Sequence, residues 1–139
     1  LSPWLAAREP GDVVRITGPD GDVYYRGEDR IVVLAAGPGI GPAVAIGERA
    51  RMEGAAVAIV HPADNTVHRE RLRSLDEAGA TVYPAEDGLE AVTNDAINSI
   101  GGSVFVYGFS PFVQEAIRAI ESAGYDSEDV KVESFGPGP

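Results

Sequence analysis

Short apolar runs alternate with helical patterns from residue 31 onward, and this alternation limits the fold more than any other feature of the chain. Three runs are apolar without interruption, as is typical of strands buried on both faces; they cover residues 31–35, 56–60 and 104–107. Weaker strand patterns cover residues 80–83 and 130–133. The sequence therefore predicts five strands.

Four helical patterns separate these strands, over residues 42–53, 65–78, 89–97 and 110–123. We expect Pro42 to open the first helix and either Asn65 or Thr66 to cap the second. Ser110 is expected to cap the fourth, with Pro111 at its first position. Strands joined in this way predict an α/β fold with a parallel, doubly wound sheet in the order 3-2-1-4-5 and helices on both faces.

The charge of the chain limits its partners. Its 139 residues include 22 acidic and 11 basic side chains, for a formal charge of −11, and Lys131 is the only lysine. Such a surface repels nucleic acid and anionic membranes. The acidic, lysine-poor composition resembles that of proteins from halophilic archaea. The chain has no cysteine, which excludes disulfides and thiolate metal sites within it, and we expect no metal site.

The N-terminal sequence differs in character from the rest. Residues 13–17 and 23–25 have strand patterns, and a Gly/Pro turn at residues 18–21 lies between them. A hinge is expected at Gly27-Glu28-Asp29. We therefore predict a β segment over residues 1–28 and a separate α/β domain over residues 29–139.

No apolar run is long enough to span a bilayer, and the opening Leu1-Ser2-Pro3-Trp4 does not resemble a signal peptide. The sequence also lacks an initiator Met. We expect a cytoplasmic fragment of a longer protein.

A glycine-rich turn follows the first strand, with the sequence Gly37-Pro38-Gly39-Ile40-Gly41-Pro42. Glycines allow backbone to approach a diphosphate closely, and the unpaired N–H groups at a helix N-terminus favour an anion. The spacing is G-x-G-x-x-P rather than the dinucleotide fingerprint G-x-G-x-x-G. Nucleotide binding is one interpretation, and an ordinary strand-to-helix turn is the other.

Two further loops are expected at the same edge of the sheet. Gly108-Phe109-Ser110-Pro111 follows the fourth strand, and His61-Pro62-Ala63-Asp64 follows the second. Ligands of doubly wound sheets bind beyond the carboxyl ends of the strands, where the strand order reverses. The first and fourth strands meet at that point, so the sequence predicts a ligand crevice between their loops.

Several polar residues near this edge have two interpretations each. Asp64 either binds a ribose hydroxyl, which favours NAD over NADP, or caps the following helix. Arg69 and Arg73 either meet a 2′-phosphate or pair with acids on their own helix. His61 is a candidate ligand contact, and His68 is expected to pack with the leucines of its helix.

These motifs resemble the NAD(P)-binding half of ferredoxin–NADP reductase-type flavoproteins. The resemblance rests on Gly37-x-Gly39-Ile40-x-Pro42, Gly108-Phe109-Ser110-Pro111-Phe112-Val113 and Glu133-Ser134-Phe135-Gly136. Upstream, Pro10-Gly11-Asp12-x-Val14 and Thr17-Gly18-Pro19-x-Gly21 resemble the last strands of that family's FAD barrel. The likeness covers most of the chain in the expected order.

The resemblance implies hydride transfer between nicotinamide C4 and flavin N5, with NAD(P) bound here and FAD held by an upstream domain of the same chain. The further partner that the resemblance implies is an electron-acceptor protein. The resemblance also implies that Glu133 and Phe135 lie near the flavin and nicotinamide rings. The implied cofactor-binding residues are Gly37, Pro38, Gly39, Ile40, Gly41, Pro42, His61, Asp64, Tyr107, Gly108, Phe109, Ser110 and Pro111.

Two departures from the family pattern bear on activity. Tyr107 stands where the family usually has Cys; its phenol would block the nicotinamide, stack on a ring or point into the sheet. The flavin-binding Arg-x-Tyr-Ser/Thr signature is absent from these 139 residues, so we expect this chain alone to be inactive. The alternative function is a non-catalytic nucleotide-sensing or docking module, and a flavodoxin-like fold without a dinucleotide is a third possibility.

Overall fold

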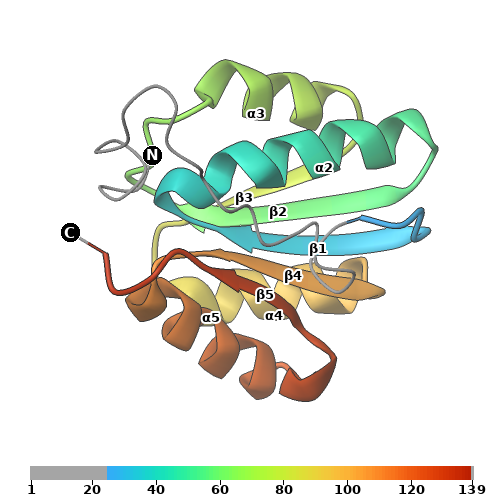
Figure 1. Cartoon of the computed structure of the whole chain (residues 1–139). Coiled ribbons are helices and arrows are strands. Elements are labelled where there is room, and N and C mark those ends of the chain that lie inside the picture. Colours follow the sequence, from blue (N-terminus) through green and yellow to red (C-terminus); the bar gives the residue numbers. More distant parts are fainter. Residues whose placement is uncertain (1–24, 139) are drawn as a thin grey trace, which may run out of the picture.

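The computed structural model describes residues 25–138, and the expectations for residues 1–24 lie outside this range. Five parallel strands form one sheet in the order β3-β2-β1-β4-β5 (Figure 1). Their bounds are β1 Arg30–Ala35, β2 Ala56–Pro62, β3 Thr81–Ala85, β4 Ser103–Gly108 and β5 Lys131–Ser134. The predicted fold class and strand order are confirmed.

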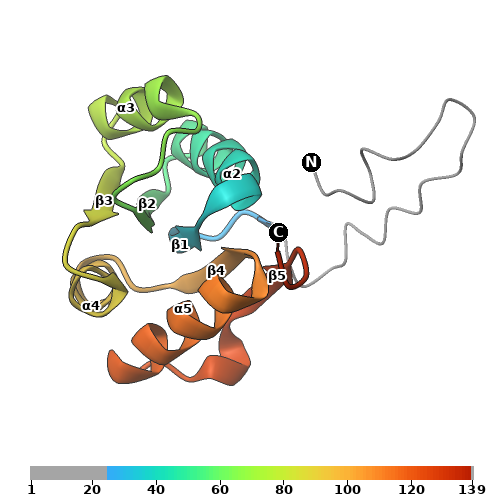
Figure 2. The same ribbon diagram turned by 90° about the vertical axis from the view of Figure 1, so that its left-hand side faces the viewer.

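Helices cover both faces of the sheet. Two helices, α2 (Ile40–Met52) and α3 (Arg69–Glu77), lie on one face, and α4 (Leu89–Ser99) and α5 (Ser110–Ser122) lie on the other (Figures 1 and 2). Short 3₁₀ turns occur at Gly37–Gly39 and Ser127–Asp129. No helix within residues 25–138 has the length and apolar character needed to cross a bilayer.

The alternation of strand side chains divides the core into two layers. On β1, Val33 faces α2 and α3, whereas Val32 faces α4 and α5. Val33 is paired in register with Ile59 of β2 and Phe105 of β4, so three neighbouring strands present apolar side chains to the same helices. Both faces of these central strands are buried, which explains why their sequences are continuously apolar.

The expected start of the first helix at Pro42 is wrong by two positions, and the expected cap of the fourth helix at Ser110 is wrong by one, although that helix does begin at Ser110. α2 begins at Ile40, because residues 37–39 already form a 3₁₀ turn with Pro38 in its first turn. Phe109, not Ser110, occupies the N-cap position of α5, and Ser110 is its first helical residue. The Ser110 hydroxyl instead donates a hydrogen bond to the carbonyl of Gly136 at 3.0 Å.

The expected cap of the second helix is also wrong. The Asn65 side chain forms a local turn in which Oδ1 accepts from the N–H of Val67 and Nδ2 donates to its carbonyl. The helix therefore begins at Arg69, after His68 in a left-handed conformation with φ of 55°. His68 is exposed and does not pack with the helix leucines as expected.

The segment before β1 is fastened to the domain rather than free as a hinge. Tyr25 is 8% exposed, and its hydroxyl donates to the backbone carbonyl of Glu28 at 3.3 Å. The Glu28 carboxylate forms an ion pair with Lys131 of β5, with 3.2 Å between Oε2 and Nζ. The domain boundary after residue 28 stays a prediction, since the residues before Tyr25 are not described.

A buried hydroxyl on α4 gives a stability prediction. Thr93 is fully buried, and its Oγ1 has no hydrogen-bond partner within the described residues. Thr93→Val keeps the shape and removes the unsatisfied polar group, so we expect the free energy of unfolding to rise by about 1 kcal/mol. Urea unfolding measures the change. Thr93→Ser is the control and should destabilise the domain because it keeps the hydroxyl and loses a methyl group. A less stable valine variant would show that the hydroxyl is satisfied in solution.

Candidate functional site

The glycine turn after β1 and the end of β4 are in direct contact. The N–H of Ala36 donates to the carbonyl of Tyr107 at 3.1 Å. Gly39 lies so close to Tyr107 that an added Cβ would overlap the tyrosine backbone. The two loops that the sequence placed at one edge of the sheet are therefore neighbours, and glycine is required at residue 39 for their contact. The ligand crevice between them stays a prediction.

The ring of Phe109, from the loop after β4, lies against the glycine turn after β1. A Cβ built on Gly37 would lie 3.7 Å from the ring of Phe109, and one built on Gly138 would lie 3.2 Å from it. The ring thus lies between the turn after β1 and the C-terminal segment. The sequence predicted a ligand crevice between the two loops, and the half-buried ring of Phe109 lies beside the glycine turn there.

The segment after β5 lies across the start of α5. The N–H of Ser110 donates to the carbonyl of Gly136 at 2.7 Å, and the Ser110 and Ser134 hydroxyl oxygens are 3.0 Å apart. The N–H of Phe135 donates to the carbonyl of Gly108 at 2.9 Å. Glu133 and Phe135, which the family resemblance implied, are thereby held next to the loop after β4. This contact also occupies the first N–H group of α5.

Tyr107 packs against the sheet. Its side chain is 2% exposed and lies on the α2 side, stacked on Phe105 with 6.4 Å between the ring centroids. Of the three placements considered from the sequence, it adopts the one that points into the sheet. Burial raises the pKa of its phenol well above the ordinary value, and the charges of Glu133 and Glu28 raise it further.

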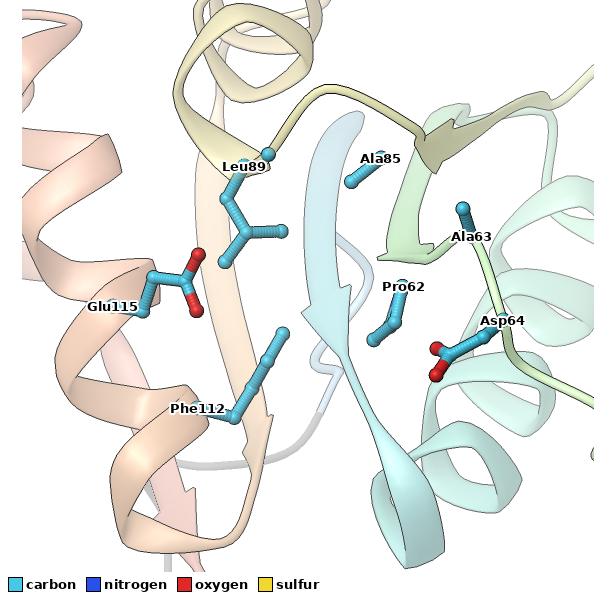
Figure 3. Close-up of a pocket in the computed structure, with 8 residues that line it drawn as sticks. Pro62, Ala63, Asp64, Ala85, Leu89, Phe112 and Glu115 are labelled. Atoms are coloured by element: carbon cyan, nitrogen blue, oxygen red, sulfur yellow. The ribbon is translucent and has the colours of Figure 1, made fainter.

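A cavity of about 280 Å³ opens at the carboxyl edge of the sheet, on the α4 and α5 side (Figure 3). Leu89 and Phe112 extend into it from α4 and α5, and Pro62 at the end of β2 lies across from them. The carboxylates of Asp64 and Glu115 face it from opposite sides. Asp64 does not cap α3, which begins at Arg69. Its placement leaves the ligand-contact interpretation in place.

A second cavity, of about 340 Å³, lies on the other side of the same loop. It is lined by His61, Ala63, Asn65, Arg69, Leu72, Arg73, Asp76, Val82 and Pro84. The ring Nδ1 of His61 donates to the carbonyl of Pro62 at 2.7 Å. Arg73 pairs with Glu70 at 3.2 Å, as one interpretation of the sequence expected. His61 and Asp64 therefore line different cavities, although both follow β2.

Two residues at this edge were not among the predicted site residues. Glu115 follows Phe112 by three positions on α5, so helical periodicity alone puts both on one face. His68 lies beside Gly41, where an added Cβ would be 3.6 Å from its Nε2. Its left-handed backbone has no clear sequence signal. Across residues 25–138, no three His, Asp or Glu side chains are grouped as metal ligands would be.

Comparisons with known proteins identify the fold. No family model matches the sequence, and no curated protein matches it. A flavohemoglobin from Malassezia yamatoensis with bound FAD and heme superposes with a TM-score of 0.60 and 17% identity, over 82% of this chain and 33% of that chain. The Amycolatopsis cytochrome P450 reductase GcoB gives 0.58 and 18%, over 78% and 38%.

The flavohem-like FAD/NAD-binding domain of the nitric oxide dioxygenase from Vibrio cholerae O1 biovar El Tor gives a TM-score of 0.53 and 15% identity, over 84% of this chain and 56% of that chain. The present chain thus spans between a third and somewhat more than half of each of these proteins. At such low identity the comparisons establish shared architecture: this chain has a fold that is also found within a flavohemoglobin, a cytochrome P450 reductase and an FAD/NAD-binding domain.

Proposed function

We propose that this chain is the pyridine-nucleotide-binding domain of an FAD-dependent reductase. The observation that carries the proposal is the cavity beyond the carboxyl ends of the strands, next to the two touching loops of the strand-order reversal. Doubly wound sheets bind nucleotides at this place. The description of the Vibrio neighbour as an FAD/NAD-binding domain supports the choice of ligand.

The adenosine half of the coenzyme fits the cavity of Figure 3. Its volume of about 280 Å³ is near the lower end of ligand pockets, roughly 300 Å³, which suits one half of a dinucleotide. Leu89 and Phe112 provide apolar walls for a base. The diphosphate would then lie against the N-terminal end of α2 at Gly37–Gly39, where aligned backbone dipoles favour an anion.

The nicotinamide would lie at the end of β4, close to Tyr107, Glu133 and Phe135. The reaction supplied by the bound cofactors is transfer of a hydride from nicotinamide C4 to flavin N5; this chain contributes binding and orientation. The FAD belongs to an upstream domain that ends in residues 1–28, and an acceptor protein receives the electrons. The domain alone is expected to be inactive, and we place the intact reductase in the cytoplasm.

A second candidate is a nucleotide-sensing module without redox activity. Tyr107 in place of the family's usual cysteine favours it, as does the ring of Phe109, which lies beside the glycine turn proposed to hold the diphosphate. The two functions differ in the colour of the longer protein. A reductase that includes the upstream domain is yellow and oxidises NAD(P)H with an artificial acceptor, whereas a sensing module is colourless.

Titration with NADH and NADPH tests the proposed site. We expect amide resonances to shift at Gly37, Gly39–Gly41 and Gly108–Ser110, and also at Asp64 and Glu115 beside the cavity. The shifts should saturate with a single dissociation constant, because one molecule binds across all of these groups. Shifts confined to the exposed faces of α3 or α4, or no shift with either coenzyme, would contradict nucleotide binding at this edge.

A further inference from the structure

We propose that Asp64 and Glu115 make the site selective for NADH over NADPH. The inference rests on the proposed function and deepens it, since it names which of the two coenzymes the same cavity accepts. Neither the fold nor the glycine turn decides this choice. The charges that line the cavity decide it.

The two carboxylates come from separate elements and converge on one space. Asp64 lies on the loop after β2, and Glu115 lies on α5 one helical turn beyond Phe112. In Figure 3 their oxygens extend toward the cavity from opposite walls, and the side chains between them are apolar. A nucleoside seated on Leu89 and Phe112 therefore has carboxylate oxygens on both flanks.

Basic side chains do not neutralise this pair in the described part of the chain. Arg118 lines a neighbouring hollow with Glu115, but the two form no ion pair within 4.0 Å. Arg69 and Arg73 line the other cavity, beyond the loop that carries Asp64, and Arg73 is paired with Glu70. Asp64 and Glu115 thus present two negative charges to a ligand in the cavity.

The two coenzymes differ only at the ribose 2′ position. The 2′-hydroxyl of NADH donates a hydrogen bond, and a carboxylate is an acceptor for it. The 2′-phosphate of NADPH adds nearly two negative charges and brings oxygens that accept rather than donate. Like charges placed together oppose binding, so the carboxylates act against NADPH as well as for NADH.

The experiment compares the adenosine halves and the whole coenzymes on the unchanged chain. Calorimetry measures binding of AMP, adenosine 2′,5′-bisphosphate, NADH and NADPH. We expect NADH to bind at least about tenfold more tightly than NADPH, with the same order for the two smaller probes. The variants are Asp64→Asn and Glu115→Gln, singly and together, because an amide oxygen still accepts from a hydroxyl and carries no charge.

The double variant should gain about tenfold in affinity for NADPH and change by less than about threefold for NADH. Glu121→Gln on the same helix is the control: it removes the same charge outside the cavity and should leave the ratio unchanged. Equal binding of both coenzymes, or tighter binding of NADPH that weakens in Arg69→Ala, would overturn the selectivity and leave nucleotide binding intact. Absence of binding by all four probes would overturn the proposed function itself.

Discussion

Gly39→Ala is expected to lower the free energy of unfolding by about 3 kcal/mol, the upper part of the usual range for overpacking. The new Cβ would overlap the backbone of Tyr107, and neither partner has room to move. Ala35 precedes the turn and Ile40 follows it, and both are fully buried. The turn after β1 must therefore separate from β4. Denaturant unfolding measures the loss, and coenzyme binding should weaken with it because the two loops no longer meet.

Gly41→Ala is the matched control, two positions along the same turn. Its Cβ would lie 3.6 Å from the Nε2 atom of His68, an ordinary contact, and Gly41 is already within α2. Alanine is favoured over glycine inside a helix by up to about 1 kcal/mol, so this variant should be as stable as the parent or slightly more stable. Equal losses in the two variants would mean that the contact with Tyr107 does not limit the choice of residue.

Alkaline solution is expected to destabilise the domain through Tyr107. Its pKa is raised in the folded state, so below pH 10 the phenol is neutral in both states and does not change the free energy of unfolding. Above that pH the unfolded chain loses the proton while the folded chain keeps it. Stability then falls by up to about 1.4 kcal/mol for each further pH unit, until the folded phenol also ionises. Unfolding measured at a series of pH values from 8 to 12 should show this slope.

Tyr107→Phe should remove one tyrosine's share of that slope. The ring still stacks on Phe105, so its apolar packing is kept in the variant. Tyr25 and Tyr125 also have raised pKa values and remain in the variant, which means that the difference between the two proteins reports Tyr107 alone. Parallel pH profiles for the parent and the variant would show that the phenol ionises as freely in the folded state as in the unfolded one.

The central strands could be predicted from the sequence because burial on both faces of a strand requires a continuous apolar run. The runs at residues 31–35, 56–60 and 104–107 all lie within observed strands, and the winding order followed from the alternation with helices. The first residues of the helices were harder to predict. A serine or asparagine before a helical pattern suggests a cap, but Ser110 is already helical and Asn65 closes a turn of its own.

The candidate site could be predicted only in part, because glycine spacing identifies loops that touch but not the side chains that surround them. Glycine spacing identified the two loops that touch, since only glycine permits the approach at Gly39. Sequence spacing cannot show what fills the space around such loops, and Phe109 does so here. Asp64 was predicted because it follows a strand. Glu115 became a candidate only when the structure showed that its face of α5 lines the cavity.

The ion pair between Glu28 and Lys131 joins positions 103 residues apart, just ahead of the first strand and at the start of the last. Because the strands are parallel, the pair joins the amino ends of β1 and β5, and the chain leaves the sheet after Ser134 at the opposite edge. The pair therefore fastens the segment that enters the domain to the last strand that the chain adds to the sheet. Release of this edge strand and loosening of the entering segment should accordingly occur together, as one opening event in hydrogen exchange.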